Sequence, residues 1–578
     1  MAQNVLGTRS RSRALISLSA GGSMMAAGTG VGTLATALFI GMASPAGASA
    51  FTVTTLNSGG AGSLRQAIID ANASPGADTI DFAPGVTGEI WLTSNLPTIS
   101  EGLTITGPGA DSLAINGVSL YHAFDIDTSG GGAVTISGLT VTHSIGTSAF
   151  NRGGAISVRN TGLNLDDVHL TDNSVSSVVS STYGGGLFVE NQSDAGDVVI
   201  SNSKFARNAS STSLPGARTM GGAAMLRAAN VSITNSSIED NEADAAGGVY
   251  LVATSTFNLD NSSISGNVGH NWVGGIGVGA NNVRVTNSTI TGNTSGGNFG
   301  GGYFGAGGYG PTSEPLLMSN TRISDNIAGH DVGGAIILTI ESSSTLDRVT
   351  VTGNTGDTVG GLDVLGSANL SSSTIANNTG SGVNFGYGFS FGANTVSACS
   401  ANAVQPAAPA PSVPSVVRVT NSTVSGNSLE GISTKDNQFA PGSASIDSMN
   451  VRPAGCGIIN RTSIDLGLTH TLAANNGGDD VAASAFSLFS LIEKPSAAVF
   501  PGYGTQFGVN PELMPLEQVS NTVSVVPIAI GSAAWNAGWP GFTPPPETDQ
   551  RGLPRVVDII DIGAYEVQEP FVLPKFTG

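Results

Sequence analysis

The sequence predicts an all-β protein that folds as a right-handed parallel β-helix, a solenoid of short strands with a helix capping its N-terminal end. Two observations carry this prediction. Glycine pairs recur between Gly153 and Gly361 at intervals of 26 to 37 residues, most often 27. Most intervals also contain a strand-like segment that alternates with period two and ends in asparagine. A period near 27 is too short for a propeller blade and lacks helical spacing. The handedness follows from the general preference of parallel crossovers.

Composition excludes several other classes. Glycine makes up 81 of 578 residues, but it has no strict three-residue period, so collagen is excluded. Heptads of a coiled coil are missing, and 40% hydrophobic residues are enough to build a core rather than a disordered chain. The formal net charge of −20 repels phosphate backbones, so we expect no nucleic-acid partner.

The first 50 residues predict an export signal. Three arginines between residues 9 and 13 precede the apolar, glycine-interrupted segment Ala14–Met42, and Ala48–Ala50 supplies the small residues that signal peptidase accepts. We therefore expect residues 1–50 to be a signal peptide and Phe51 to begin the mature chain. Retention of the segment as a membrane anchor is the alternative, and it would be the only membrane contact. Both versions place the protein outside the cytoplasm, secreted or at the cell surface.

The cysteine content fits export. Cys399 and Cys456 are the two cysteines, and an oxidising compartment permits a disulfide between them. Two unpaired loop cysteines are the alternative. The spacing does not form a Cys-x-x-Cys or Cys/His metal motif.

Residues 51–115 are expected to form the N-terminal cap and first coils. After a strand at Phe51–Thr54, Ser63 can cap an amphipathic helix that closes the open end of the apolar core. The residues expected on the apolar face of this helix are Leu64, Ala67, Ile68 and Ala71. The segment Gly62–Ile80 looks like the cap shared by many secreted bacterial β-helix proteins.

Residues 116–440 carry the repeats. A short apolar strand such as Val249–Val252 follows most glycine pairs, and a longer alternating segment such as Val231–Asn241 comes next. One coil cannot bury its inward side chains alone, so stacking at ~4.8 Å must join them into a continuous core. Glycine pairs suit tight corners. Stacked asparagines can bond turn backbone and one another, since an amide both donates and accepts. The Pro/Ala-rich segment 394–417 predicts an exposed loop.

The repeat motif resembles a known family. Gly333–Ile336 and Phe205–Asn208 are similar to the repeats of chlamydial polymorphic outer membrane proteins, which are surface adhesins with a pectin-lyase-like β-helix. The similarity spans roughly residues 150–430. It implies the same fold and a surface role.

Residues 441–578 are expected to hold the last coils and a C-terminal module. Four segments in order resemble the choice-of-anchor module of exported β-helix proteins: Asn510–Leu513, Gly531–Ala534, Thr548–Arg555 and Asp561–Glu566. Opposite charges gather in the last two. We expect a structural ion-pair cluster that holds the last coil closed, in preference to a catalytic carboxylate pair. Its members would be Asp549, Arg551, Arg555, Asp561 and Glu566.

Residues just before successive glycine pairs should form a lengthwise stripe at one corner. This stripe contains Asp244, His270, Trp272, Phe299, His330, Asp331 and Asp357. Sugars suit such a surface, because rings stack on their C–H faces and carboxylates bond their hydroxyls. Asp331 and Asp357 lie on adjacent coils and could share a calcium ion, the single candidate cofactor. Ordinary turn residues on a solvated face are the alternative, and no catalytic or metal-binding residue can be assigned.

Other acidic residues have simpler explanations. Asp166 and Asp167 suggest the clustered aspartates of β-helix polygalacturonases, yet Asp167 occupies the slot that Asn235 holds in another coil, which predicts a turn residue. His169 lies in the same strand as this aspartate pair, at the outward position that Ser237 holds in another coil. Asp479 and Asp480 follow a glycine pair and predict a solvated turn.

These observations predict an exported protein that presents a long face for adhesion, binding a polysaccharide or a host or envelope component without catalysis. A polysaccharide lyase or glycoside hydrolase that acts along the stripe is the main alternative. A purely structural envelope spacer is the third hypothesis.

Overall fold

A computed structural model describes residues 47–129, 131–146, 151–191, 196–297, 300–307, 316–386, 415–434, 464–496 and 498–568. The chain divides into two units, 1–45 and 46–578, and the described residues belong to the second. Residues 1–46 of the predicted signal peptide, Phe299, Cys399 and Cys456 lie outside the described residues. None of the described helices is long and apolar enough to span a membrane.

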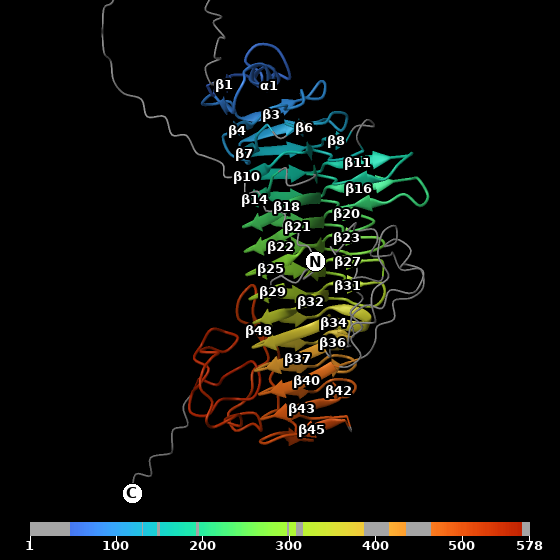
Figure 1. The fold of residues 1–578 in the computed structure, drawn as a ribbon, viewed down its shortest axis with the longest axis vertical. Coiled ribbons are helices and arrows are strands. Elements are labelled where there is room, and N and C mark those ends of the chain that lie inside the picture. Colours follow the sequence, from blue (N-terminus) through green and yellow to red (C-terminus); the bar gives the residue numbers. More distant parts are fainter. Residues whose placement is uncertain are drawn as a thin grey trace, which may run out of the picture. The chain divides into compact units, whose positions relative to one another are not determined.

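The described chain winds into stacked coils whose strands form one 44-stranded sheet in which every pairing is parallel (Figure 1). Strands at equivalent places in successive coils form four columns. They are called A, B, C and D here, in the order in which the chain passes through them within one coil. Column A contains β1 (Ala50–Val53), β2 (Asp78–Phe82), β4 (Leu103–Thr106), β7 (Val134–Thr142), β10 (Leu163–Thr171), β14 (Val198–Ser201), β18 (Ala224–Thr234), β21 (Val249–Asp260), β25 (Asn282–Thr286), β29 (Leu316–Ser319), β32 (Ala335–Asp347), β34 (Thr355–Ser371), β37 (Ser415–Thr420), β40 (Ile464–Thr469), β43 (Ala485–Leu488) and β45 (Val499–Pro501).

Column B contains β3 (Gly88–Trp91), β5 (Leu113–Asn116), the later parts of β7 and β10, β15 (Lys204–Ala206), β19 (Ser237–Glu239), β22 (Ser263–Ser265), β26 (Thr289–Thr291), β30 (Arg322–Ser324), β33 (Thr350–Thr352), β35 (Thr374–Ala376), β38 (Thr423–Ser425), β41 (Leu472–Ala474), β44 (Leu491–Ile492) and β46 (Gln506–Phe507). Column C contains β8 (Ile145–Gly146), β11 (Ser174–Ser177), β16 (Ala209–Thr212), β20 (Glu242–Ala243), β23 (Val268–Gly269), β27 (Thr294–Ser295), β31 (Ile327–Ala328) and the beginnings of β34 and β36 (Thr379–Gly386).

Column D follows the glycine pairs and contains β6 (Phe124–Asp127), β9 (Ile156–Arg159), β13 (Leu187–Glu190), the early parts of β18 and β21, β24 (Ile276–Gly279), β28 (Tyr303–Gly307), parts of β32, β34 and β36, β39 (Ile432–Ser433) and β42 (Val481–Ala482). In the described residues, four short strands lie outside the large sheet. They are β12 (Thr182–Tyr183), β17 (Thr219–Met220), β47 (Glu517–Gln518) and β48 (Ser524–Val525).

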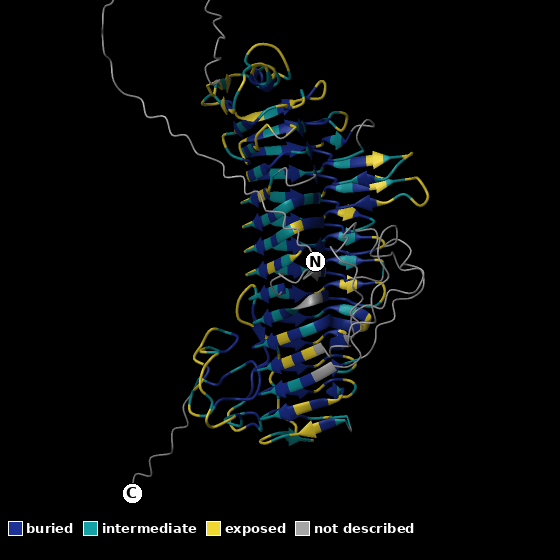
Figure 2. Cartoon of the chain, viewed as in Figure 1, coloured by how far each residue is buried: buried dark blue, intermediate teal, exposed yellow. Residues whose placement is uncertain are grey.

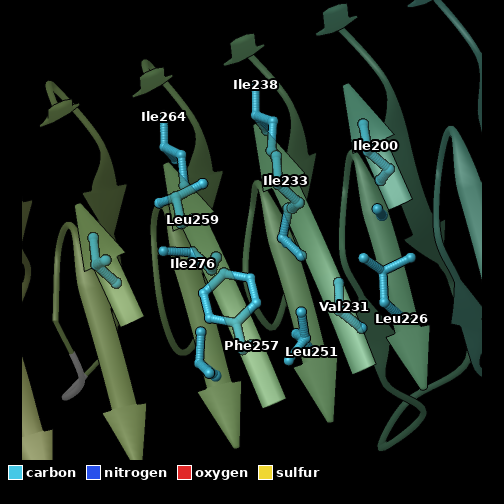
Figure 3. Packing of buried hydrophobic residues seen from close by; sticks show 14 of the residues in the cluster. Ile200, Leu226, Val231, Ile233, Ile238, Leu251, Phe257, Leu259, Ile264 and Ile276 are labelled. Carbon is cyan, nitrogen blue, oxygen red and sulfur yellow. The ribbon is translucent and has the colours of Figure 1, made fainter. Parts of the chain in front are cut away.

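Inward side chains of successive coils stack into rows that fill the solenoid. Ile238 is the register partner of Ile264, and Leu226 is that of Leu251, so each apolar residue packs on its equivalent in the next coil (Figure 3). The rows join into one buried cluster that continues from Val53 to Val499. Burial therefore alternates along the strands, with dark inward positions and lighter outward ones (Figure 2).

The helix α1 (Leu64–Ala73) closes the N-terminal end of this core. Ser63 caps it, because its Oγ accepts a hydrogen bond from the backbone N–H of Gln66 at 3.2 Å. The four residues predicted for its apolar face are the buried ones, and all belong to the main core: Leu64, Ala67, Ile68 and Ala71. The predicted capping helix is confirmed.

The recurring asparagines form a buried ladder between columns B and C. Asn267 shows the pattern: its Nδ2 donates to Asn293 Oδ1 at 2.9 Å and to the Ile238 carbonyl at 2.9 Å, and its Oδ1 accepts from Asn241 Nδ2 at 2.9 Å. Ten residues continue this chain of amides, each at most 2% exposed: Asn173, Asn208, Asn241, Asn267, Asn293, Asn326, Asn354, Asn378, Asn427 and Asn476.

Asp480 ends the ladder, which corrects the prediction that it lies in a solvated turn. Asp480 is fully buried, while Asp479 is exposed. The Oδ1 of Asp480 accepts from the Asn476 amide group at 2.7 Å, and its Oδ2 accepts from the Lys494 N–H at 2.6 Å. Burial raises the pKa of this carboxyl. The Asp480 side chain accepts the hydrogen bond that the asparagine of a further coil would accept. The sequence does not reveal this role, because Asp479 and Asp480 follow the glycine pair side by side.

The glycine pairs lie at the corner between columns C and D. Gly153 has φ 57°, but a close approach is the more general reason for glycine there. A Cβ on Gly274 would lie 2.3 Å from the Gly301 carbonyl oxygen, and one on Gly334 would lie 2.3 Å from that of Gly361. The corners therefore stack at a distance that leaves no space for a side chain.

The C-terminal segment 517–568, here called the strap, lies along the outer side of column B. Thr522 Oγ1 donates to Asn320 at 3.1 Å, the Gln550 side chain bonds Thr350 at 3.0 Å, and the Ala564 N–H donates to Thr423 Oγ1 at 3.0 Å. The predicted ion-pair cluster lies within this strap, where Arg555 Nη2 reaches Asn421 at 3.3 Å. It therefore braces the coils of β38 and β41, which lie before the last coil, and this corrects the expectation that it closes the last one.

Charge balance makes this cluster sensitive to protons. Asp549, Arg555 and Glu566 are fully buried, Asp561 is nearly so, and Arg551 bonds Asp549 at 2.6 Å. Two guanidinium groups face three carboxyls, so one bound proton neutralises the set. Burial, reinforced by the Asp561 charge, raises the pKa of Glu566 to about 8.

Replacing one ladder amide should destabilise the protein. Asn267→Ala leaves buried groups of Asn241, Asn293 and Ile238 without a partner, so we expect the free energy of unfolding to fall by about 2–3 kcal/mol. Asn258→Ala is the control, because that amide faces outward and makes a longer bond of 3.4 Å to Ser232. Urea unfolding of both variants measures the difference. An equal loss of unfolding free energy in both variants would show that the ladder amide contributes no more to stability than an outward-facing one.

The strap should weaken as pH rises. The folded protein keeps a proton on Glu566 that an unfolded glutamic acid, with its ordinary pKa of 4.5, has already released, so this stabilisation is complete below that pH and declines towards pH 8. We expect the thermal midpoint to fall by about 2–4 °C between pH 5 and pH 8. Glu566→Gln, a neutral isostere, should flatten the dependence in scanning calorimetry. An unchanged slope in this variant would contradict the assignment.

Candidate functional site

The predicted stripe residues lie at the corner between column C and the glycine pairs, where the chain leaves β20, β23 and β31. Backbone hydrogen bonds join the corners of adjacent coils. The Asn271 N–H donates to the Asp244 carbonyl at 2.9 Å, and the Val359 N–H donates to that of Asp331 at 3.0 Å. The corner residues are therefore held at successive levels of the stack, which the repeat spacing predicts.

Two imidazole–carboxylate contacts occupy this corner. His270 Nε2 lies 2.7 Å from Glu242 Oε1, and His330 Nδ1 lies 3.6 Å from Asp357 Oδ2. All four side chains are more than half exposed. Glu242 is absent from the predicted stripe because it belongs to β20, one strand before the corner. Its place directly after the ladder residue Asn241 is the signal that could have identified it.

Asp331 follows His330 directly at this corner. Its φ of 46° is left-handed, a conformation that aspartate tolerates better than most residues, and the side chain is half-buried. Burial raises the pKa of Asp331, Asp357 adds to the effect, and His330 opposes it. Two carboxyls and one imidazole thus meet at one exposed point, where they can accept and donate hydrogen bonds or exchange a proton.

A metal centre does not form from these groups alone. Within the described part of the chain, no three His, Cys, Asp or Glu side chains are grouped closely enough to hold one ion. His270 and His330 belong to coils separated by the β27 coil, so they lie two coils apart.

Trp272 is a correction to the stripe, because its ring is not available to a ligand. The side chain is 4% exposed and packs against Tyr250 at a centroid distance of 5.7 Å. Gly277 makes room for it, since a Cβ there would lie 3.1 Å from the ring. Tyr250 is the register partner of Gly277 in the previous coil and points outward. Gly277 has no side chain to continue this outward row, and the Trp272 ring fills the space. The ring belongs to a second apolar cluster on the outside of column D, with Met220, Val332, Ile336 and Leu338.

The remaining acidic candidates serve neighbouring coils. Asp167 has φ 52° and Asn202 has φ 50°, which confirms the predicted turn role. Asp166 accepts hydrogen bonds from Ser201 Oγ and Asn202 Nδ2, both at 2.7 Å. His169 lies in register with Lys204 and, through it, with Ser237, as predicted.

Comparison with known proteins supports the fold. A family model described as "right handed beta helix region" matches residues 122–314. No curated protein sequence matches this chain. A mutant of the periplasmic alginate epimerase AlgG aligns at 11% identity and a TM-score of 0.36, covering 71% of this chain and 78% of that one. The A-module of the Azotobacter vinelandii mannuronan C-5 epimerase AlgE6 aligns at 15% identity and a TM-score of 0.37, covering 78% and 99%.

The family match and the 44-stranded parallel sheet confirm the predicted right-handed parallel β-helix.

Removing the Trp272 ring should affect stability rather than binding. Trp272→Ala leaves a cavity beside Tyr250 and Gly277, and we expect a loss of about 3–5 kcal/mol in the free energy of unfolding. Trp91→Ala is the control, because that side chain is 58% exposed. Urea unfolding followed by circular dichroism measures both. Similar stability of the two variants would contradict the buried packing.

Proposed function

We propose that this protein is exported and binds a polysaccharide, or another surface component of a host or an envelope, along the outside of its β-helix without catalysis. The convergence of His330, Asp331 and Asp357 carries the proposal. Adjacent coils hold these groups by backbone bonds, and the side chains of His330 and Asp357 face solvent. A sugar with several hydroxyls can bond carboxylates and imidazole together, and little entropy is lost because the scaffold is rigid.

The outer faces of the coils support a hydroxyl-rich, weakly charged ligand. Ser237, Ser263 and Thr289 occupy one outward row of column B, and stacking repeats such rows at about 4.8 Å. A net charge of −20 disfavours strongly anionic partners.

The sequence resemblances support a surface location. Repeats similar to those of polymorphic outer membrane adhesins, a predicted signal peptide and a C-terminal region similar to the choice-of-anchor module together favour a secreted or cell-surface adhesin.

A polysaccharide lyase or hydrolase is the alternative, and one observation favours it. The pKa of Asp331 is raised beside an exposed His330–Asp357 contact, and such an arrangement suits acid–base chemistry. Calcium held between Asp331 and Asp357 would instead support binding of an acidic sugar.

The double variant Asp331→Ala/Asp357→Ala distinguishes these functions. Using purified protein, with and without calcium, we expect about tenfold weaker retention in affinity electrophoresis on polysaccharide gels, equivalent to about 1.4 kcal/mol. Asp111→Ala is the control, because its side chain is 97% exposed and lies away from the corner. We also expect wild-type protein to release neither reducing ends nor unsaturated products. Product formation that the double variant abolishes would establish the enzyme, and unchanged retention would reject the corner as a binding site.

A further inference from the structure

Exposed aromatic side chains gather at the C-terminal end of the solenoid. Five aromatic residues are exposed in the described part of the chain, and four of them belong to the last two coils and the strap. These are Phe486 at 53%, Phe500 at 64%, Tyr503 at 80% and Trp539 at 48%. The fifth, Trp91, lies in β3 near the N-terminal end. Since the whole chain is only 6% aromatic, this grouping requires an explanation.

The rings form one surface, which we call the aromatic platform: Phe486, Phe489, Phe500, Tyr503 and Trp539. Phe486 and Phe500 are register partners in column A, where both point outward. Phe489 lies between the other two rings, with centroid distances of 5.4 Å to Tyr503 and 6.4 Å to Trp539. Phe489 therefore joins the exposed rings of Tyr503 and Trp539, and Phe486 and Phe500 lie beside them on column A.

Two glycines bring the turn that carries Tyr503 against the platform. A Cβ on Gly502 would lie 3.0 Å from Phe486 Cζ, and a Cβ on Gly504 would lie 2.3 Å from Phe489 Cδ1. The backbone of Gly502 and Gly504 thus packs directly against the rings of Phe486 and Phe489, and the Tyr503 ring remains exposed. Gly504 also has φ 72°, which favours glycine.

The platform is rigid and strained at its centre. Phe489 has φ 44°, in the slot that asparagine holds at Asn421, and a bulky residue in this region is an outlier. On the strap side, the Trp539 N–H donates to His470 Nε2 at 3.2 Å. Burial lowers the pKa of His470 to about 4, so this imidazole remains neutral and keeps accepting that bond.

The chemistry of the platform selects its ligand. None of the three segments that form it carries a charge: residues 481–492, 495–511 and 524–546 contain no Asp, Glu, Lys or Arg. In β45, Pro501 lacks an N–H and blocks the free edge, which disfavours pairing with a strand of a second copy. Exposed rings without ionic partners suit the C–H faces of uncharged sugar rings.

We propose that the aromatic platform is a binding site for an uncharged polysaccharide, separate from the corner at His330. This inference rests on the proposed function, carbohydrate binding by the β-helix, but it does not depend on the corner residues. It binds by ring stacking, so its affinity does not depend on salt. Both sites lie on one scaffold, so a long polysaccharide that reaches both gains avidity.

The double variant Tyr503→Ala/Trp539→Ala tests this site in the full protein. Hydroxyethyl cellulose and dextran serve as uncharged probes and polygalacturonate as the acidic one. We expect the wild type to be retarded by at least one uncharged probe, equally at 50 mM and 500 mM salt, and the double variant to bind at least tenfold more weakly. Trp91→Ala, the matched exposed control, should bind like the wild type, and circular dichroism should confirm that all variants fold.

Tryptophan emission separates this proposal from the corner site. We expect the uncharged probe to shift the emission of the wild type and of Asp331→Ala/Asp357→Ala alike, and not that of Trp539→Ala. A response lost only in the corner variant would overturn the platform while supporting the corner. Absence of binding to either uncharged probe would also overturn it. So would a platform variant that instead loses binding to neutral phosphatidylcholine vesicles or changes from dimer to monomer in light scattering.

Discussion

Vertical register between coils is the constraint on which the whole structure depends. The apolar rows, the asparagine ladder and the stacked glycine corners all require each coil to lie directly over the next. The ladder enforces this most strictly, because each buried amide must meet both the amide of the next coil and a backbone carbonyl. A slip by one residue would place polar groups in the core and leave every amide in the row without its partner.

Register also gives the outer surface its character. Once the inward positions are filled, the outward positions of each column repeat at fixed height, and residues far apart in sequence become neighbours. His330 and Asp357 meet in this way, as do Phe486 and Phe500. The scaffold therefore fixes the relative positions of side chains at a corner or on the open face of a column.

Much of this organisation could be predicted from the sequence because it is periodic. The spacing of glycine pairs identified the coils, the alternation identified the inward rows, and Ser63 with its helix pattern identified the cap. The failures concern packing that the period does not encode. Trp272 is buried because Gly277 interrupts an outward row, and Asp480 is buried because a ladder needs a final acceptor. The strap's position depends on contacts between residues roughly 130 to 200 apart, which no local pattern reveals. The aromatic platform was missed for the same reason, since it combines two coils and the strap.

The strap has a mechanical consequence. Its final described residues are bonded sideways to Asn421, Thr423 and His470, in coils that precede the last one. Tension applied at the C-terminal side therefore enters the solenoid laterally and loads a buried ion-pair cluster in shear.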